Sequence, residues 1–264
     1  MQRVRAVLDA LHIPLFGVCS FVPLRPHLLA CRAAERLPKT PRAVIVCLFP
    51  YRVDSDLPRN LSRYACVPDY HRVVGSALWQ AAEKLSPLLS AEVVPFVDNS
   101  PIPEVYAAAL AGLGCIGDNG LLITPRYGSY VFIGTLVTDA ALSAPRTGIQ
   151  RCPGCGACRR QCPAGALTES GIDRSRCLSA VSQRKGKLTA EEEAALIKNG
   201  LIWGCDRCQE VCPLNREAVC EPFVGFDTYE PWLDTVPAKA ILKEKPYGWR
   251  GAAVLERNRK LFLK

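Results

Sequence analysis

The chain has 264 residues, of which 49% are hydrophobic and 22% charged. This composition excludes an intrinsically disordered protein and allows one large globular domain or two modest ones. The formal net charge of +8 favours anionic partners without identifying any of them, and no apolar run reaches the roughly 20 residues that a membrane-spanning helix needs. We therefore expect no association with a membrane.

The first twenty residues, "MQRVRAVLDALHIPLFGVCS", are basic and then apolar, as in a signal peptide. Asp9 and His12 interrupt the apolar stretch, however, and no clear cleavage site follows it. Four apolar residues share one face at helical spacing and predict an amphipathic helix instead. They are Val4, Val7, Leu8 and Leu11.

The first part of the chain, residues 1–145, mixes helical and strand patterns. We predict strands at 42–51, 91–98, 120–124 and 130–139, with a turn at 125–129 between the last two. Helical periodicity covers 71–89, and an alanine-rich helix at 103–114 is closed by glycines. This alternation predicts the α+β class, with a mixed α/β domain at the N-terminus.

The second part, residues 146–225, contains two runs of cysteines separated by a helix. Thr189 and Glu192 form a predicted capping box at the start of this helix, and Gly200 ends it. The remaining residues, 226–264, are rich in proline, lysine and arginine and are interpreted as a basic C-terminal tail.

The first cysteine run has the spacing C-x2-C-x2-C-x3-C-P, which is typical of bacterial two-cluster ferredoxins. The second run ends in the same way but lacks one cysteine at its front, and Cys177 between the runs can supply it. Crosswise ligation of two 4Fe-4S clusters follows. The first cluster takes Cys152, Cys155, Cys158 and Cys212, and the second takes Cys162, Cys177, Cys205 and Cys208.

Two alternatives to this assignment remain. Structural zinc also uses C-x2-C pairs, and Cys220 competes with Cys177 for the eighth ligand position.

In a chain of this size without an export signal, fourteen cysteines favour metal ligation in a reducing compartment over disulfides. We therefore expect a cytoplasmic protein.

Several motifs occur in the same order as in the epoxyqueuosine reductase family. They are "SRYACVPDYH" (62–71), "VPFVDNSPIPE" (94–104), "AGLGCIGDNGLLITPRYGSYVFIGTLVTD" (111–139) and the two cysteine runs. The chain resembles this family from about residue 40 to about residue 220, and more distantly it resembles the reductive dehalogenases. The resemblance implies a cobalamin-binding first domain, followed by a bacterial two-cluster ferredoxin-like domain. It also implies reduction of an epoxide in a modified tRNA nucleoside, the last step of queuosine synthesis.

The resemblance also implies roles for particular residues. Asp98 matches the catalytic acid, and burial by its apolar neighbours would raise its pKa; taken alone, "DNSP" favours a turn over a catalytic residue. Cobalamin-facing or substrate-facing positions are expected at two segments, whose alternative interpretation is structural loops. The first comprises Arg63, Tyr64, Asp69, Tyr70 and His71, and the second comprises Asn119, Leu121, Leu122, Ile123 and Thr124. We expect no histidine ligand to cobalamin, since no histidine lies in a ligand-type motif.

The sequence departs from the family at two places. Cys115 and Asp118 replace the usual tryptophan and lysine of the glycine-rich segment. The sequence also ends near "WRGAAVLERNRK", where longer members continue into a helical-repeat domain that helps to hold tRNA. Basic residues near this end either contact RNA phosphates or form a solvated surface. They are Arg250, Arg257, Arg259, Lys260 and Lys264.

The leading hypothesis is therefore a monomeric, cobalamin-dependent iron–sulfur reductase that acts on epoxyqueuosine in tRNA. An external low-potential donor supplies the electrons. One alternative is a related corrinoid reductase of a small organic substrate such as an organohalide. The other is a non-catalytic two-cluster electron carrier whose first half only docks a partner.

Overall fold

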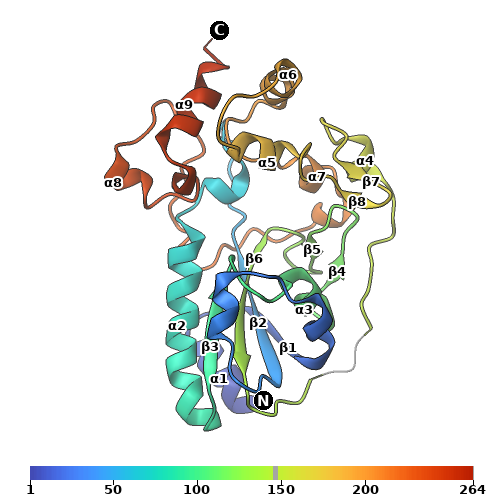
Figure 1. The fold of residues 1–264 in the computed structure, drawn as a ribbon, viewed down its shortest axis with the longest axis vertical. Coiled ribbons are helices and arrows are strands. Elements are labelled where there is room, and N and C mark those ends of the chain that lie inside the picture. The colour runs from blue at the N-terminus through green and yellow to red at the C-terminus, as the bar shows by residue number, and fades with distance from the viewer. Residues whose placement is uncertain (145–147, 264) are drawn as a thin grey trace.

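The structure, a computed structural model, describes residues 1–144 and 148–263. Its centre is a four-stranded sheet of order β1-β2-β6-β3, in which every neighbouring pair is antiparallel (Figure 1). The strands are β1 Leu15–Ser20, β2 Ala43–Pro50, β3 Val93–Val97, β4 Cys115–Ile116, β5 Leu122–Ile123, β6 Val131–Thr138, β7 Leu167–Thr168 and β8 Gly171–Ile172. The α-helices are α1 Gln2–Ala10, α2 Tyr70–Leu89, α3 Glu104–Leu110, α4 Ala157–Arg160, α5 Leu178–Gln183, α6 Ala190–Asn199, α7 Arg207–Glu210, α8 Lys239–Leu242 and α9 Ala252–Lys260.

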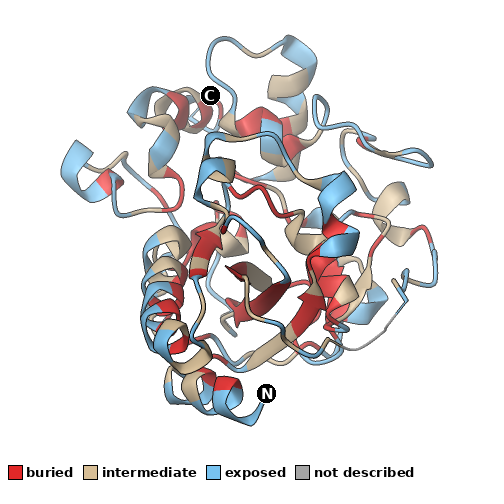
Figure 2. Ribbon diagram, turned by 60° about the horizontal axis from the view of Figure 1, so that its bottom comes forward, coloured by how far each residue is buried: buried red, intermediate tan, exposed pale blue. Residues whose placement is uncertain are grey.

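Strand β2 is buried along its whole length, because both faces of the sheet are covered (Figure 2). Side chains of a strand alternate between its two faces. Ile45, Cys47 and Phe49 accordingly pack into the core beneath α1 and α2. Val46 and Leu48 pack into the core on the opposite face, beneath α3. The run of apolar residues that predicts this strand is thus a consequence of two separate cores.

Helix α2 lies along one face of the sheet and carries residues of the candidate site at its N-terminus. Its buried stripe has helical spacing and includes Val74, Leu78 and Leu85. The helix approaches β6 closely at Gly134, where an added Cβ would lie 2.5 Å from Leu78 Cδ1. Asp69 caps the helix by accepting a hydrogen bond from the backbone N–H of His71.

The cysteine-rich part packs against the end of the sheet at which β2 and β3 finish. Arg59 forms an ion pair of 2.7 Å with Asp206, which lies between two cysteines of the second run. A buried polar contact lies nearby, where Asn215 Nδ2 donates to Ser129 Oγ at 2.8 Å. An isolated bridge also pairs Leu61 with Trp203. These contacts join the two parts through buried groups.

The C-terminal segment, interpreted from the sequence as a basic tail, is folded against the rest of the chain. Tyr247 and Leu255 share a buried cluster with Leu61 and Trp203. Arg257 Nη1 donates to the backbone oxygens of residues 184 and 186 at 2.6 and 2.7 Å. This side of the guanidinium is therefore engaged within the chain. The expected boundary between residues 145 and 146, and Lys264, fall outside the described residues.

The structure confirms the α+β class and most of the predicted elements, including the capping box between Thr189 and Glu192. The first helix ends at Ala10, so Leu11 lies just outside it, and β1, which begins at Leu15, is a strand that the sequence analysis does not predict. Within the described ranges, no helix combines the length and apolar character needed to cross a membrane.

Candidate active site

Asp98 follows β3 directly and stands at the end of the sheet that receives the cysteine-rich part. Its backbone has φ +52°, a left-handed conformation that few residues other than glycine adopt. Its carboxylate oxygen Oδ2 accepts hydrogen bonds from Tyr70 Oη and His71 Nε2, both at 3.0 Å. Strained backbone of this kind is often found at functional sites. Here it directs the carboxylate toward the start of α2.

The imidazole of His71 is held between two carboxylates. Its Nδ1 lies 2.8 Å from Asp69 Oδ1, and its Nε2 lies 3.0 Å from Asp98 Oδ2. Tyr70 stacks on this ring with a centroid distance of 4.1 Å and on Phe132 at 4.4 Å. Hydrogen bonds to Asp69 and then to Asp98 raise the pKa of His71 to about 9. At neutral pH His71 is therefore an imidazolium that donates from both nitrogens.

The expectation that apolar neighbours raise the pKa of Asp98 is wrong. The hydrogen bond from His71 is the largest influence and lowers the pKa of this carboxyl, and burial only partly opposes it. Phe96 is buried within the sheet, whereas the Asp98 side chain is 58% exposed and faces a cation. Asp98 is therefore a carboxylate at neutral pH, and the proton of the pair resides on His71.

Glu104 is a second carboxyl beside Asp98, and the sequence analysis missed it. It begins α3 and accepts a hydrogen bond from the backbone of Asp98. Burial, followed by the negative charge of Asp98, raises the pKa of Glu104 well above its ordinary value. Among the described residues its Oε1 has no hydrogen-bond partner. In the sequence it looks like an ordinary acidic residue in a helix's first turn, so only the fold identifies it.

Arg63 and Tyr64 connect this site to the second cysteine run. The backbone N–H of Arg63 donates to Asp206 Oδ2 at 2.8 Å, and Tyr64 Oη accepts from Trp203 Nε1 at 2.8 Å. Arg63 Nε is buried and has no partner among the residues that the structure describes. This unpaired donor suits a large ligand that is rich in amides, such as cobalamin, between the two parts.

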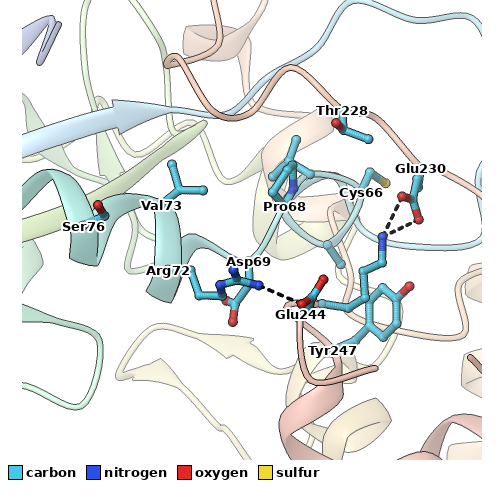
Figure 3. A pocket seen from close by; sticks show the side chains of 13 residues that line it. Cys66, Pro68, Asp69, Arg72, Val73, Ser76, Thr228, Glu230, Glu244 and Tyr247 are labelled. Carbon is cyan, nitrogen blue, oxygen red and sulfur yellow. Dashed lines mark hydrogen bonds and ion pairs between the residues drawn. The ribbon is translucent and has the colours of Figure 1, made fainter. Parts of the chain in front are cut away.

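A cavity of about 540 Å³ opens beside the first turns of α2 (Figure 3). Asp69 lines it, so the cavity borders the carboxylate that holds His71. Two ion pairs cross its wall, Arg72 with Glu244 at 3.4 Å and Lys245 with Glu230 at 2.6 Å. Because each cation has an acidic partner, the cavity suits an uncharged polar ligand better than a phosphate.

The second predicted cofactor segment lies between β4 and the turn before β6. Asn119 is buried, and its Oδ1 accepts from the backbone N–H of Leu121. Leu122 packs in the core beneath α3, and Thr124 Oγ1 donates to the backbone oxygen of residue 128. Ile123 lines a cavity together with cysteines of the first run. Cofactor contacts by these residues stay predictions.

The cysteines gather in two groups. Cys152, Cys155, Cys158 and Cys212 line one small cavity, together with Asp118 and Asn119. In the other group, burial is the main cause that raises the pKa of Cys205 and of Cys208. Cys177 and Cys162 add to this effect at Cys205, and Cys205 and Cys177 add to it at Cys208. Four thiols around one space are the donor set of a 4Fe-4S cluster. This arrangement is compatible with the crosswise ligand sets, which stay a prediction.

Comparison with known proteins gives two matching families. Residues 151–215 match a 4Fe-4S double cluster binding domain, and residues 31–99 match an epoxyqueuosine reductase QueG domain. The chain is 40% identical to the epoxyqueuosine reductase of Aliivibrio fischeri over 60% of this chain and 43% of that protein. It is 31% identical to that of a Synechococcus species over 83% of this chain and 74% of that protein.

Solved structures show the same fold. A crystal structure of epoxyqueuosine reductase with an epoxyqueuosine-modified tRNA-Tyr stem loop has a TM-score of 0.84 at 22% identity, and the match covers 99% of this chain and 80% of that one. A reductive dehalogenase is more distant, with a TM-score of 0.50 at 14% identity over 98% of this chain and 35% of that one. The chain spans about half the length of several of the curated relatives that it matches.

Proposed function

Because the chain belongs to the epoxyqueuosine reductase family, we propose that it reduces epoxyqueuosine to queuosine in tRNA. The observation that carries the proposal is the contact of Asp98 with Tyr70 and His71, at the end of the sheet against which the cysteine-rich part packs. A relative of the same fold was solved with an epoxyqueuosine-modified tRNA stem loop, which supports tRNA as the substrate.

The reaction takes up two electrons and two protons. Both carbon–oxygen bonds of the epoxide break, a carbon–carbon double bond forms, and the oxygen leaves as water. We assign the first proton to the pair of Asp98 and His71. His71 holds it at Nε2, and the half-exposed Asp98 carboxylate passes it to the departing oxygen. Tyr70 stacks on the imidazole and keeps the ring aligned. The buried carboxyl of Glu104 accepts a hydrogen bond from the backbone of Asp98.

The proposed cofactors are two 4Fe-4S clusters and cobalamin. When bound, the clusters would supply electrons one at a time, and cobalamin would supply a low-potential metal centre for the reduction. The two cysteine groups would hold the clusters, and Arg63, with its unpaired Nε, would face cobalamin. The B12-dependent chemistry of the dehalogenase that shares this fold supports the corrinoid. A cytoplasmic location and an external low-potential donor complete the proposal, since ligand thiols stay reduced in that compartment.

The cavity beside α2 is the proposed position for an uncharged part of the modified nucleoside. It borders Asp69, and both of its cations are already paired with carboxylates. RNA phosphates would then contact other basic groups of the chain. The predicted basic residues near the C-terminus are candidates, although Arg257 and Arg259 already make internal contacts.

Replacement of the proposed proton relay tests the assignment. Asp98→Asn should retain both clusters and cobalamin but lose at least about 100-fold in turnover of epoxyqueuosine RNA, because a positioned acid or base typically contributes that much. Asp9→Asn, an exposed change on α1, is the matched control and should keep full activity. Turnover of Asp98→Asn at the rate of the control would remove Asp98 from the chemistry.

The dehalogenase-like fold favours one second candidate, reduction of a small organohalide by the same site. Fully loaded protein that releases halide from an aryl bromide and leaves epoxyqueuosine RNA unchanged would favour that activity. Clusters without any corrinoid uptake would instead favour a simple electron carrier.

A further inference from the structure

A second cavity, of about 720 Å³, lies between the loop that follows α5 and helix α9, at the end of the molecule away from the N-terminus (Figure 1). Of the described residues that line it, four are cations and one, Glu193 of α6, is an acid. The cations are Lys185, Lys187, Arg250 and Arg257. By contrast, the cations of the cavity beside α2 are paired with carboxylates. The second cavity, called the basic cavity below, therefore favours an anion.

Arg257 of α9 holds the loop that carries the two lysines. Its Nη1 donates to the backbone oxygens of Arg184 and Gly186 at 2.6 and 2.7 Å. Gly186, between the lysines, adopts φ +87°, a left-handed conformation that suits glycine. Lys185 and Lys187 are exposed, and neither forms an ion pair with any residue that the structure describes. Their charges are therefore free to bind a ligand.

Arg250 and Trp249 lie beside each other at the start of α9. The guanidinium carbon of Arg250 stands 3.7 Å from the centroid of the Trp249 ring. Arg250 Nε is buried and has no hydrogen-bond partner within the described part of the chain. Trp249 is nevertheless 60% exposed. An exposed indole stacked on a guanidinium is the kind of surface on which proteins stack the bases of single-stranded RNA.

A short segment, residues 245–250, connects the basic cavity with the cavity beside α2. Lys245 and Tyr247 line the cavity beside α2 (Figure 3), and Arg250 lines the basic one. Trp249 lies between these positions in the chain. A ligand that extends from the first cavity along this segment would meet an aromatic ring and then a group of unpaired cations.

We propose that the basic cavity binds backbone phosphates of the RNA stem loop, and that Trp249 stacks on a base between these phosphates and the modified nucleoside. The inference rests on the proposed function, because it takes the nucleoside to lie in the cavity beside α2. Lysine and arginine bind phosphates and release the counterions around them. An acidic protein is the other partner that a basic surface fits, but the connection to the nucleoside cavity favours RNA.

Fluorescence anisotropy at several salt concentrations tests the inference. The full chain, loaded with both clusters and cobalamin, is titrated into a labelled RNA stem loop that carries epoxyqueuosine. The double variant Lys185→Gln, Lys187→Gln should bind more weakly. Its slope of log affinity against log salt should be shallower by about 1–2, because each phosphate contact contributes about 0.7–0.9 to that slope. Trp249→Ala should lose about fivefold or more in affinity, since one stacked base contributes that much, and should keep the slope.

Lys39→Gln is the matched control. This exposed lysine precedes β2, at the end of the sheet opposite the cysteine-rich part, and its loss should change neither affinity nor slope. Affinities and slopes equal to those of the control in both test variants would overturn the inference. If the double variant binds RNA normally but its clusters are reduced more slowly by an acidic flavoprotein, the surface binds a protein donor and the inference is wrong.

Turnover separates this inference from the proposed function. A wild-type chain that binds the stem loop and leaves epoxyqueuosine unchanged would overturn the proposed function, while weaker binding by the two variants would still support the phosphate site. A loaded wild-type chain that does not bind the stem loop would overturn both.

Discussion

At the scale of single residues, the sequence indicates Asp98 as a candidate site residue but does not indicate its charge. The motif "PFVDNSP" marks the residue, and its local neighbours indicate a buried, neutral acid. The fold brings His71 and Tyr70 to it from the start of α2, and these partners lower its pKa. The motif suggests that burial raises the pKa of Asp98, but in the fold burial raises the pKa of Glu104 instead. The partners that set the charge of Asp98 lie more than twenty residues away, so no local pattern contains them.

The pH dependence of the pair of Asp98 and His71 follows from these contacts. The pKa of His71 is raised from 6.5 to about 9, so its stabilising contribution is complete below about pH 6.5 and is lost as the pH rises through about 9. The lowered pKa of Asp98 makes its contribution complete above its ordinary value of 3.8, and that contribution is lost as the pH falls through the lowered pKa.

Nuclear magnetic resonance titration of the His71 ring measures this directly. The wild-type ring should titrate near pH 9, and the ring in Asp98→Asn should titrate at lower pH because one charged acceptor is lost. A wild-type His71 that titrates near 6.5 would contradict the ion pair and the proposed source of the proton.

At the scale of elements, helical periodicity predicts α2 well, and an uninterrupted apolar run predicts the fully buried strand β2. The predicted helix at 71–89 differs from α2 by one residue. Strand β1 was missed because its short apolar run follows a helical pattern directly. Pairing with β2 from Leu15 to Ser20 makes it a strand, and this pairing depends on a segment more than twenty residues away.

The packing of α2 against the sheet predicts opposite effects for two glycines. Gly134→Ala should lower the free energy of unfolding by about 1–3 kcal/mol, because the new methyl group meets Leu78 and Val74. Gly75→Ala is the matched change inside α2, where the nearest atom is 3.9 Å away. It should raise the free energy of unfolding by about 0.5–1 kcal/mol. Urea denaturation measures both, and equal effects would contradict the close approach of helix and strand.

At the scale of the whole molecule, cysteine spacing predicts the cluster-binding part but not how it is attached. The attachment depends on buried polar groups such as Asp206, whose side chain is 1% exposed and paired with Arg59. The turn at 117–120 likewise reaches the cysteines from the first part. Sequence patterns locate each part separately, whereas contacts between distant residues assemble the candidate site from both.

Breaking this attachment should be costly. Arg59→Met leaves the buried Asp206 without its ion-pair partner and should destabilise the chain by about 3–5 kcal/mol. Arg126→Met removes an exposed pair with Glu221 of 2.6 Å and should leave stability nearly unchanged, since solvent screens such pairs. Urea unfolding of the two variants checks this contrast. A similar small effect in both would mean that Asp206 is not held by Arg59.

The reaction itself is tested most directly by mass spectrometry of the nucleoside. The chain, loaded anaerobically with both clusters and cobalamin, is reduced and mixed with an RNA stem loop that carries epoxyqueuosine. The account predicts that the nucleoside released by digestion has lost one oxygen atom and is queuosine. Epoxyqueuosine that stays unchanged, in protein shown by spectroscopy to hold all its cofactors, would contradict the proposed function.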